Sequence, residues 1–280
     1  MTNHIDLHLH STASDGTLRP SEVVQLAKAR GLHTIALTDH DTTDGLAEAI
    51  ETGKSIGVEV IVGLEINNED ETRNVDFLCY GLDRSYQPLQ DQLLAIRDAR
   101  VGRAQGMIKK LATMGMPVEW ARVLKYAGDA KSIARPHIAR AMVDAGFVAS
   151  MQEAFDKYIS DDGPAYVHRL QLTPQEVIDH AHAAGGVIVL AHPGHAGTTH
   201  LVPQFVELGL DGVEVYYSDH TDAMRSELLA LAQHYNLIVT GGSDFHSPGD
   251  QSHAELGSIA VPDEVAPRLK ERIANRGIGD

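Results

Sequence analysis

The sequence is poor in the residues that build disulfide-bonded, membrane-spanning or aromatic-rich proteins. Its single cysteine, Cys79, excludes an internal disulfide bond and lies in an apolar run, where a thiol behaves as a small buried hydrophobe. There is no run of about 18 apolar residues, which excludes a membrane-spanning helix. The N-terminus lacks the basic start and apolar segment of a secretory signal. We therefore expect a cytoplasmic protein.

Positive charge is also scarce. The chain has 23 Lys and Arg residues against 39 Asp and Glu residues, which gives a formal net charge of −16. This balance, without a basic cluster, disfavours non-specific binding to nucleic acid or to membranes. A local cationic pocket remains compatible with an acidic chain if the pocket binds metal ions. The 280 residues, 43% of them hydrophobic, suffice for one large α/β domain or one domain with an insertion.

Apolar runs typical of strands alternate with helical patterns along most of the chain. Strands are expected over residues 4–10, 33–40, 58–66, 74–81, 187–193, 211–217, 237–244 and 256–261. Helices are expected over residues 19–31, 43–57, 173–186, 201–209 and 221–235, with one more at the C-terminus. This alternation predicts right-handed βαβ units and a parallel sheet, closed or nearly closed into a barrel of about seven strands.

The alternation stops between residues 85 and 168. Residues 89–115 have the pattern of one long helix, and shorter helical patterns follow without an intervening strand. We expect residues 85–168 to form a helical insertion that caps one end of the barrel and contributes to substrate binding. Residues 1–84 and 169–280 are then expected to form the barrel itself.

Histidine, aspartate and glutamate residues gather at the ends of the expected strands. They are His8, His10, Asp15, His40, Glu65, His192, Asp244 and His246. The strands of a parallel βα barrel end on one face, so these side chains are expected to converge there. Burying them unpaired would be costly, and nitrogen and oxygen donors without cysteine suit divalent metal ions. Histidines near turns or in polar helices, such as His182 and His253, are expected to be ordinary surface residues.

Five motifs carry this set of residues: DLHLHSTASDG, ALTDHDTTDG, GLEI, LAHPG and GGSDFH. In this order, over nearly the whole chain, they resemble the motifs of the polymerase and histidinol phosphatase (PHP) family. The resemblance implies a distorted (β/α)7 barrel, two or three divalent metal ions and hydrolysis of phosphoesters. It places His8, His10, Glu65 and Asp244 on one ion, Glu65 and His192 on a second, and Asp15, His40 and His246 on a third.

The sequence departs from the family pattern at one position. The strand after the bridging glutamate usually supplies another histidine, but this chain has NVDFLCYG there. Leu78 falls at that position, and Asp76, two residues earlier on the same face, could substitute. Two ions are therefore the cautious count and three the alternative. Mn²⁺ is the first expectation, and Zn²⁺, Fe²⁺ and Mg²⁺ also suit these ligands.

The expected chemistry is attack of water on a phosphoester. Divalent ions would make the pocket net positive and attract a phosphate group although the chain is acidic. A metal-bound water, held by Glu65, Asp244 and His192, is expected to attack the phosphorus.

Residues of the insertion are expected to bind the rest of the substrate. Arg103 and Arg135 are candidates for a second phosphate, because arginine binds phosphate through two parallel hydrogen bonds. His137 follows Arg135 at the expected start of a helix, where anions are favoured. His168 and His195 are further candidates for the pocket.

Two longer segments resemble one branch of the family. SIARPHIARAMVDAGFVASMQEAFDKYI and AYVHRLQLTPQEVIDHAHAAGGVIVLAHPG are similar to the branch that includes nucleoside 3′,5′-bisphosphate phosphatases. This resemblance implies removal of the 3′-phosphate, as from adenosine 3′,5′-bisphosphate to AMP. The same branch contains a 5′-3′ exoribonuclease, which is the alternative. It ranks second because the chain, with 5% aromatic residues, offers few rings for base stacking.

Two other functions fit the sequence less well. An amidohydrolase acting on C–N bonds would usually need a bridging lysine or carbamate, whereas this chain has Glu65 and the additional set Asp15, His40 and His246. A non-catalytic metal-binding module of a larger enzyme is disfavoured by the complete ligand set and the free-standing length. The expected partner is a small nucleotide, with short RNA as the alternative. Neither a membrane nor an obligate protein partner is expected.

Overall fold

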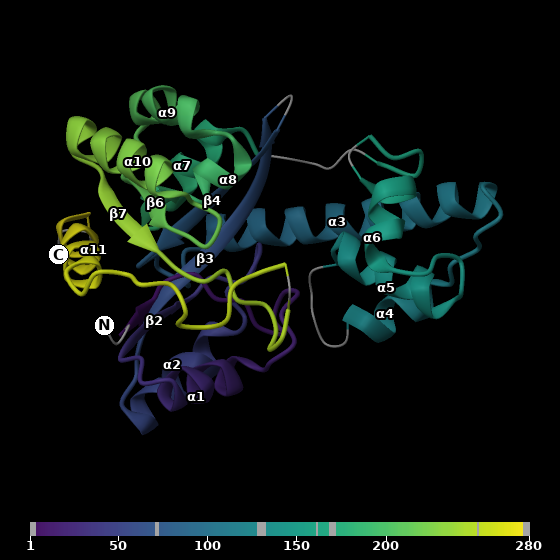
Figure 1. Ribbon diagram of the computed structural model, residues 1–280, viewed down its shortest axis with the longest axis horizontal. Coiled ribbons are helices and arrows are strands. Elements are labelled where there is room, and N and C mark those ends of the chain that lie inside the picture. Colours follow the sequence, from purple (N-terminus) through teal and green to yellow (C-terminus); the bar gives the residue numbers. More distant parts are fainter. Residues whose placement is uncertain are drawn as a thin grey trace. The chain divides into compact units, whose positions relative to one another are not determined.

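The computed structural model describes residues 4–70, 73–127, 133–160, 162–167, 172–250 and 252–276. The chain divides into two compact units (Figure 1). Unit 1 consists of Met1–Gln90 and Leu172–Asp280, and unit 2 of Asp91–Gln171. The division falls inside helix α3 (Gln87–Thr113), a few residues after the boundary at residue 85 expected from the sequence.

A seven-stranded sheet with the order β1-β2-β3-β4-β5-β6-β7 forms the centre of unit 1. The strands are β1 (Ile5–Asp6), β2 (Thr34–Leu37), β3 (Glu59–Asp70), β4 (Arg73–Tyr80), β5 (Val187–Leu190), β6 (Gly212–Tyr216) and β7 (Ile238–Gly241). The last strand returns to the first: the Leu7 N–H donates to the Gly241 carbonyl at 3.1 Å, and Leu9 forms a parallel bridge with Phe245. The sheet is thus a nearly closed barrel, which confirms the predicted distorted (β/α)7 fold.

Two details of the predicted sheet are wrong. Strand β4 is antiparallel to both β3 and β5, although the other pairs are parallel. Only two residues separate β3 from β4, too few for the crossover that a parallel pair needs. The strand expected over residues 256–261 is also absent from the described part of the C-terminal region. There the Ser258 N–H bonds to the nearby Glu255 carbonyl, and Val261 packs into the core instead of pairing.

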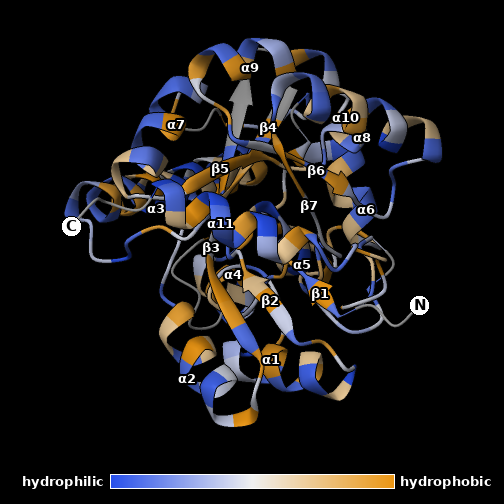
Figure 2. Cartoon of the chain, turned by 90° about the vertical axis from the view of Figure 1, so that its left-hand side faces the viewer, coloured by the Kyte–Doolittle hydropathy of each residue, from blue (hydrophilic) through white to orange (hydrophobic). Residues whose placement is uncertain are grey.

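Helices cover the barrel with their apolar faces (Figure 2). Helices α1 (Pro20–Ala29) and α2 (Leu46–Ile56) pack on β2 and the start of β3 through a cluster that includes Leu9, Val24 and Ile35. Helix α11 (Val265–Arg276) packs on the sheet through Val265 and Leu269. The remaining helical segments of unit 1 are α7 (Pro174–Ala183), α8 (Pro193–Ala196), η2 (Thr199–Leu201), α9 (Val202–Leu208) and α10 (Asp222–Tyr235).

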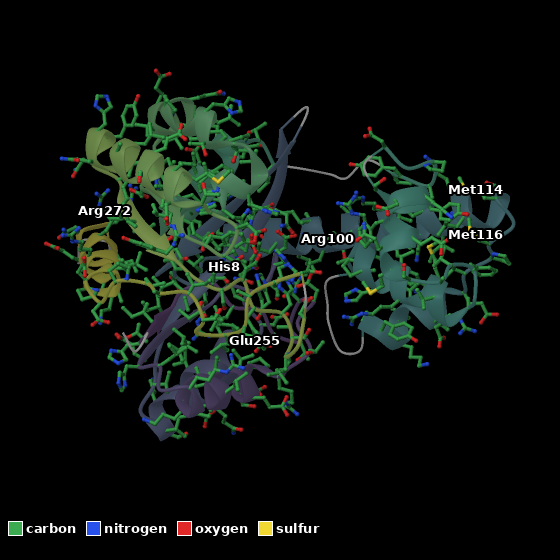
Figure 3. The ribbon with its side chains drawn as sticks, in the orientation of Figure 1. His8, Arg100, Met114, Met116, Glu255 and Arg272 are labelled. Atoms are coloured by element: carbon green, nitrogen blue, oxygen red, sulfur yellow. The ribbon has the colours of Figure 1, made fainter. Side chains whose placement is uncertain are left out.

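The described residues of unit 2 form helices joined by loops, with no strand among them. Unit 2 contains most of α3. Helix α3 is followed by α4 (Trp120–Ala127), α5 (Arg135–Asp144), α6 (Met151–Ala154) and the π-helical turn η1 (Phe155–Ile159). The separate core of unit 2 includes Met116, whereas the neighbouring Met114 is 38% exposed (Figure 3). Among the described residues, no helix of either unit is both long and apolar enough to cross a membrane.

Candidate metal centre

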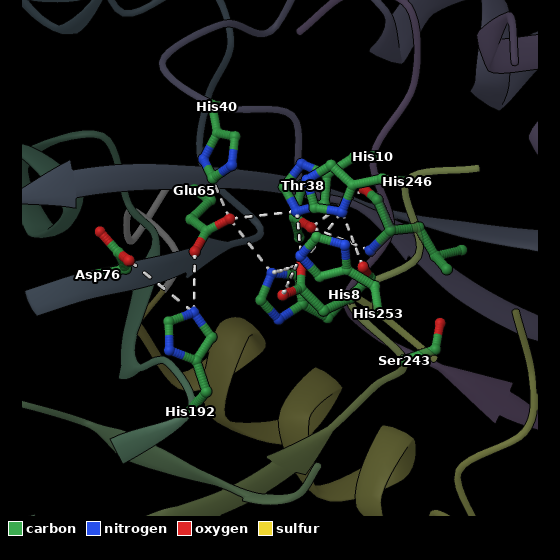
Figure 4. Close-up of polar contacts among 12 residues, drawn as sticks. His8, His10, Thr38, His40, Glu65, Asp76, His192, Ser243, His246 and His253 are labelled. Atoms are coloured by element: carbon green, nitrogen blue, oxygen red, sulfur yellow. Dashed lines mark hydrogen bonds and ion pairs between the residues drawn. The ribbon is translucent and has the colours of Figure 1, made fainter. Parts of the chain in front are cut away.

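His8 and His10 follow the short strand β1 and are fully buried. Their ring centroids are 5.2 Å apart, so both imidazoles lie on one side of the chain, as the alternation of strand residues predicts (Figure 4). Leu7 and Leu9, which alternate with the two histidines, each pack into a hydrophobic cluster of the barrel. The local sequence thus sends polar and apolar side chains in opposite directions.

Glu65, on β3, lies among four imidazoles (Figure 4). Its Oε2 is 3.2 Å from Nε2 of His8, 3.2 Å from Nε2 of His10 and 3.1 Å from Nδ1 of His40. Its other oxygen, Oε1, is 3.4 Å from Nε2 of His192, which follows β5. The buried carboxylate therefore joins side chains that come from three other segments of the chain.

Asp244, after β7, is the second carboxylate of the cluster. Its Oδ1 is 3.3 Å from Nε2 of His8 and 3.1 Å from Nε2 of His10. Its Oδ2 accepts a hydrogen bond from the Tyr217 hydroxyl at 3.1 Å. Tyr217 thereby fixes the carboxylate so that one oxygen faces the two histidines.

A third carboxylate, Asp15, lies beside His40 and His246. Its Oδ1 is 3.4 Å from Nε2 of His246, and its Oδ2 is 3.9 Å from Nε2 of His40. Potential ligand atoms lie within 4.8 Å of one another in four groups. The groups are His8, His10, Glu65 and Asp244; His10, Asp15, His40 and His246; Glu65, Asp76 and His192; and Asp244, His246 and His253. All the ligand candidates predicted from the sequence belong to these groups.

The backbone is strained at this cluster. Among the described residues other than glycine, positive φ angles occur at Asp41 (51°), His192 (30°), Asp244 (55°) and Asn236 (54°). Asn236 ends helix α10, where a left-handed residue is common. The other three lie in the turns that carry the cluster, and each costs of order 1 kcal/mol or more. Such strain is typical of residues whose side chains must be held in a particular place.

The charges within the cluster are strongly coupled. Burial disfavours the charged form of His10, but the carboxylates of Asp244 and Glu65 outweigh it and raise its pKa to about 10. Burial is likewise outweighed at His192, chiefly by Glu65, and the pKa rises to about 9. Burial dominates at His40 and lowers its pKa to about 4. Burial also opposes ionisation of Glu65 and Asp244, yet the surrounding imidazoles hold both pKa values well below their usual range.

These side chains fit divalent metal ions. Nε2 of His10 lies 3.2 Å from Glu65 and 3.1 Å from Asp244 but forms no hydrogen bond with any described residue. Leaving buried polar nitrogens unsatisfied is costly, and coordination to a metal removes that cost. Imidazoles and carboxylates without a thiolate are the donors expected for Mn²⁺, Zn²⁺, Fe²⁺ or Mg²⁺.

Comparison with known proteins agrees with this chemistry. The model of the PHP domain matches residues 6–246. The chain belongs to the PHP domain family. This membership confirms the resemblance read from the five motifs, and the match extends from the strand that precedes His8 to His246 itself.

Relatives of this PHP domain include both kinds of enzyme expected from the sequence. A 3′,5′-nucleoside bisphosphate phosphatase of Chromobacterium violaceum is 34% identical over 252 residues, which cover 88% of this chain and 88% of that protein. A 5′-3′ exoribonuclease of Haemophilus influenzae is 34% identical over 273 residues, which cover 95% of this chain and 98% of that protein. A crystal structure from Bifidobacterium adolescentis, described as a metal-dependent phosphoesterase, has a TM-score of 0.87 at 33% identity and covers 98% of this chain and 96% of that one. Together, the family and the cluster support a metal-dependent hydrolase of phosphoesters.

The PHP domain of this chain has Asp76 near the place of the missing histidine. Leu78 pairs opposite Glu65 in the β3–β4 ladder and is buried in the core, where it offers no ligand atom. Asp76 is on the same face of β4, and its Oδ2 is 3.9 Å from Nε2 of His192. Asp76 also accepts a hydrogen bond from Asn67 at 2.9 Å. The aspartate thus lies in the position from which it could complete the group of Glu65 and His192.

Sequence reasoning missed several residues that contact the PHP ligand set. His253, expected to be an ordinary surface residue, is partly buried, and its ring stacks on that of His246 with centroids 4.2 Å apart. Glu214, on β6, contacts His8, and Tyr217, the residue after β6, contacts Asp244. Glu214 had a visible signal, since it is a carboxylate between two valines of an expected buried strand. His253 had none, because its neighbours in the cluster come through a loop.

The predicted substrate residues lie in unit 2. The Arg103 Nε donates to the Val167 carbonyl at 2.7 Å, and the Arg135 guanidinium lies 5.8 Å from the centre of the Phe155 ring. His137 is buried, and its Nδ1 accepts the backbone N–H of residue 134 at the start of α5. Their contact with substrate stays a prediction.

Two further histidines were candidates for the pocket of the PHP domain. His168 lies outside the described residues. His195 is about half exposed, and its Nδ1 is 2.9 Å from Asp219.

Proposed function

We propose that the chain removes the 3′-phosphate from nucleoside 3′,5′-bisphosphates and uses divalent metal ions, with Mn²⁺ as the first candidate. The observation that carries the proposal is the buried cluster of imidazoles and carboxylates around Glu65 and Asp244. The substrate class is supported by the bisphosphate phosphatase of Chromobacterium violaceum, which is 34% identical over most of both chains. We place the enzyme in the cytoplasm and take a free nucleotide as its partner.

Three sets of side chains would hold the ions. His8, His10, Glu65 and Asp244 would hold one, Glu65, Asp76 and His192 a second, and Asp15, His40 and His246 a third. Bound ions would polarise the phosphoryl oxygens and lower the pKa of a water. The four carboxylates of these sets carry as much charge as two divalent ions supply, so a third ion would leave the pocket positive for a phosphate group.

The protein residues would position the ions and exclude bulk water from them. Glu65 belongs to two of the sets and so fixes the distance between them. Burial of His8, His10 and Glu65 keeps bulk water away, which strengthens electrostatic interactions with the reacting phosphate. The Tyr217 hydroxyl holds one oxygen of Asp244 and leaves the other toward the histidines.

A 5′-3′ exoribonuclease is the second candidate. It is supported by the relative of Haemophilus influenzae, which this chain matches over 95% of its length at 34% identity. The same cluster would serve both reactions, because each hydrolyses a phosphoester bond. In one reaction the bond holds a terminal phosphate, and in the other it joins a terminal nucleotide to the RNA. The choice therefore depends on the substrate and not on the metal ligands.

Product analysis separates the two candidates. With Mn²⁺ present, adenosine 3′,5′-bisphosphate is expected to release phosphate rapidly and to leave AMP, whereas AMP itself is expected to release little. A short RNA with a 5′-phosphate is the third substrate, measured beside the other two. Stepwise release of nucleotides from this RNA, faster than release of phosphate from the bisphosphate, would contradict the proposed function and favour the exoribonuclease.

Arg135→Ala is expected to raise the KM for the bisphosphate by about 10- to 100-fold, because a charge-assisted pair of hydrogen bonds to phosphate contributes about 1.5–3 kcal/mol. The KM for p-nitrophenyl phosphate, which has no second phosphate, is expected to change less than about twofold. Arg140→Ala, on the same helix α5, is the matched control and should leave both values unchanged. An equal effect of Arg135→Ala on both substrates would exclude a role in binding the second phosphate.

A further inference from the structure

Glu214 is a fully buried carboxylate on β6 that belongs to none of the ligand sets. Its Oε1 is 3.1 Å from Nδ1 of His8, and its Oε2 accepts the backbone N–H of His192 at 2.9 Å. Val213 and Val215, on either side of it, are also fully buried. The strand therefore carries one charged group into the core, and both of its oxygens meet segments that hold ligand candidates.

The contact with Glu214 determines which nitrogen of His8 is available to a metal. Because the oxygens of a carboxylate accept hydrogen bonds, the 3.1 Å contact with Oε1 of Glu214 assigns the proton of His8 to Nδ1. In the neutral imidazole, the lone pair then lies on Nε2. This nitrogen is the one 3.2 Å from Glu65 and 3.3 Å from Asp244. Glu214 thus turns the metal-binding nitrogen of His8 toward the other ligands.

The second oxygen of Glu214 holds the turn that carries His192. The backbone of His192 is left-handed, with φ of 30°, a conformation that needs support from its surroundings. One support is the Glu214 carboxylate at the His192 N–H. Another is His220, whose Nε2 accepts the Gly194 N–H at 3.1 Å and whose Nδ1 donates to the Val215 carbonyl at 2.9 Å. Strand β6 therefore supports the turn at two points, directly through Glu214 and indirectly through His220, which bonds to it.

A β-bulge accompanies this arrangement. The pairing of β6 with β7 shifts register between Glu214 and Tyr216. A bulge redirects the side chains that follow it. After the bulge, Tyr217 reaches Asp244, while Tyr216 packs beside the hydrophobic cluster at α11. Strand β6 and the residue after it thus contact three ligand candidates, His8, His192 and Asp244, without supplying a ligand of the described sets.

We infer that Glu214 is a positioning residue of the metal centre, which fixes the imidazole of His8 and the turn of His192 before an ion binds. This inference deepens the proposed function and rests on it, because the proposed reaction requires the ions. Carboxylates that orient ligating histidines typically change metal affinity or activity by about 10- to 100-fold when they are replaced. The inference is specific to a carboxylate, since only two acceptor oxygens can satisfy both donors.

Glu214→Gln removes one of those acceptors and keeps the shape of the side chain. The amide oxygen can accept from His8 or from His192, and the NH₂ group then faces the other donor. Asp211→Asn is a matched control at the other end of β6. Asp211 is also buried, and its carboxylate meets the His182 imidazole at 3.0 Å and the Ile188 N–H at 3.1 Å, but it lies outside the ligand sets.

Isothermal titration calorimetry of the metal-free full chain with Mn²⁺ tests the inference without measuring turnover. Glu214→Gln is expected to bind Mn²⁺ about 10- to 100-fold more weakly than the wild type, whereas Asp211→Asn should keep the wild-type affinity. Equal affinity of Glu214→Gln and the wild type would overturn the inference and leave the proposed function intact. Failure of the wild type to bind Mn²⁺ would overturn both.

A second measurement does not depend on the folding of a variant. In the wild-type chain labelled with ¹⁵N-histidine and loaded with diamagnetic Zn²⁺, NMR should show His8 with a proton on Nδ1 and the metal on Nε2. The opposite arrangement, with the proton on Nε2, would overturn the inference.

Discussion

Asp244→Asn is expected to lower kcat for any phosphoester substrate by about 10³-fold or more. The carboxylate takes part in two of the potential ligand groups and lies close to both His8 and His10. The amide of asparagine carries no negative charge, so the variant would bind the ions more weakly. Metal ions supply several kcal/mol of transition-state stabilisation, and each 1.36 kcal/mol corresponds to a factor of ten in rate.

The control for this change is Asp263→Asn, at a carboxylate whose side chain is 75% exposed. Both variants should be measured for kcat and for bound Mn²⁺ per chain. Asp244→Asn should lose both, and Asp263→Asn neither. Turnover by Asp244→Asn within about tenfold of the wild type would contradict a metal-dependent reaction at this cluster.

Removal of metal is the second large effect. A chelator is expected to abolish turnover, and Mn²⁺ should restore it. At a concentration 100 times the dissociation constant, an ion stabilises the fold by about 2.7 kcal/mol, which corresponds to an increase in Tm of about 5 °C or more for a chain of this size. Turnover that persists after exhaustive chelation would contradict the proposed function.

The stabilisation of the fold by bound Mn²⁺ should increase with pH. In the metal-free protein, the pKa values of His10 and His192 are about 10 and about 9, above the value of 6.5 for an unperturbed histidine. Their contribution to stability is thus fully present below about pH 6.5 and is lost as the pH rises through 9 and 10. Metal binding instead requires neutral imidazoles, so it releases protons and strengthens with pH.

Thermal unfolding at pH 6.5, 7.5 and 8.5, with chelator and with Mn²⁺, measures this difference. The Tm of the chelated protein should fall across the series, and the increase in Tm caused by Mn²⁺ should become larger. A difference that shrinks toward pH 8.5 would show that the imidazoles do not exchange protons for metal.

The sequence predicted the barrel because alternation of strands and helices leaves few possible topologies. Its errors have local causes. Residues 74–81 have the composition of a buried strand, but composition does not tell whether a strand runs parallel or antiparallel to its neighbours. The short connection after β3 makes β4 antiparallel. The run at residues 256–261 is apolar because Val261 packs beside α11, and packing alone does not make a strand.

The ligand candidates were predictable because each ends a strand or lies in the loop that follows, and such ends meet on one face of a barrel. Tyr217 was not, since its role depends on a contact with Asp244, which comes from another strand. Glu214 is visible in the sequence as a carboxylate between two valines, but its partner His8 is not. His253 was misjudged for a related reason. Its place beside His246 depends on the path of a loop, and no periodic pattern encodes that path.

The return of the last strand to the first has a consequence for the order of assembly. Asp6 and Ser243, which hydrogen-bond beside the cluster, are separated by 237 positions in the sequence. His8 and Asp244 therefore meet only after nearly the whole chain has been synthesised, and their set cannot hold an ion earlier. Contacts of such long range form slowly, because the entropy of closing the loop opposes them. An ion can therefore bind the set of His8, His10, Glu65 and Asp244 only after β7 has been made, and a chain truncated before β7 would lack this set.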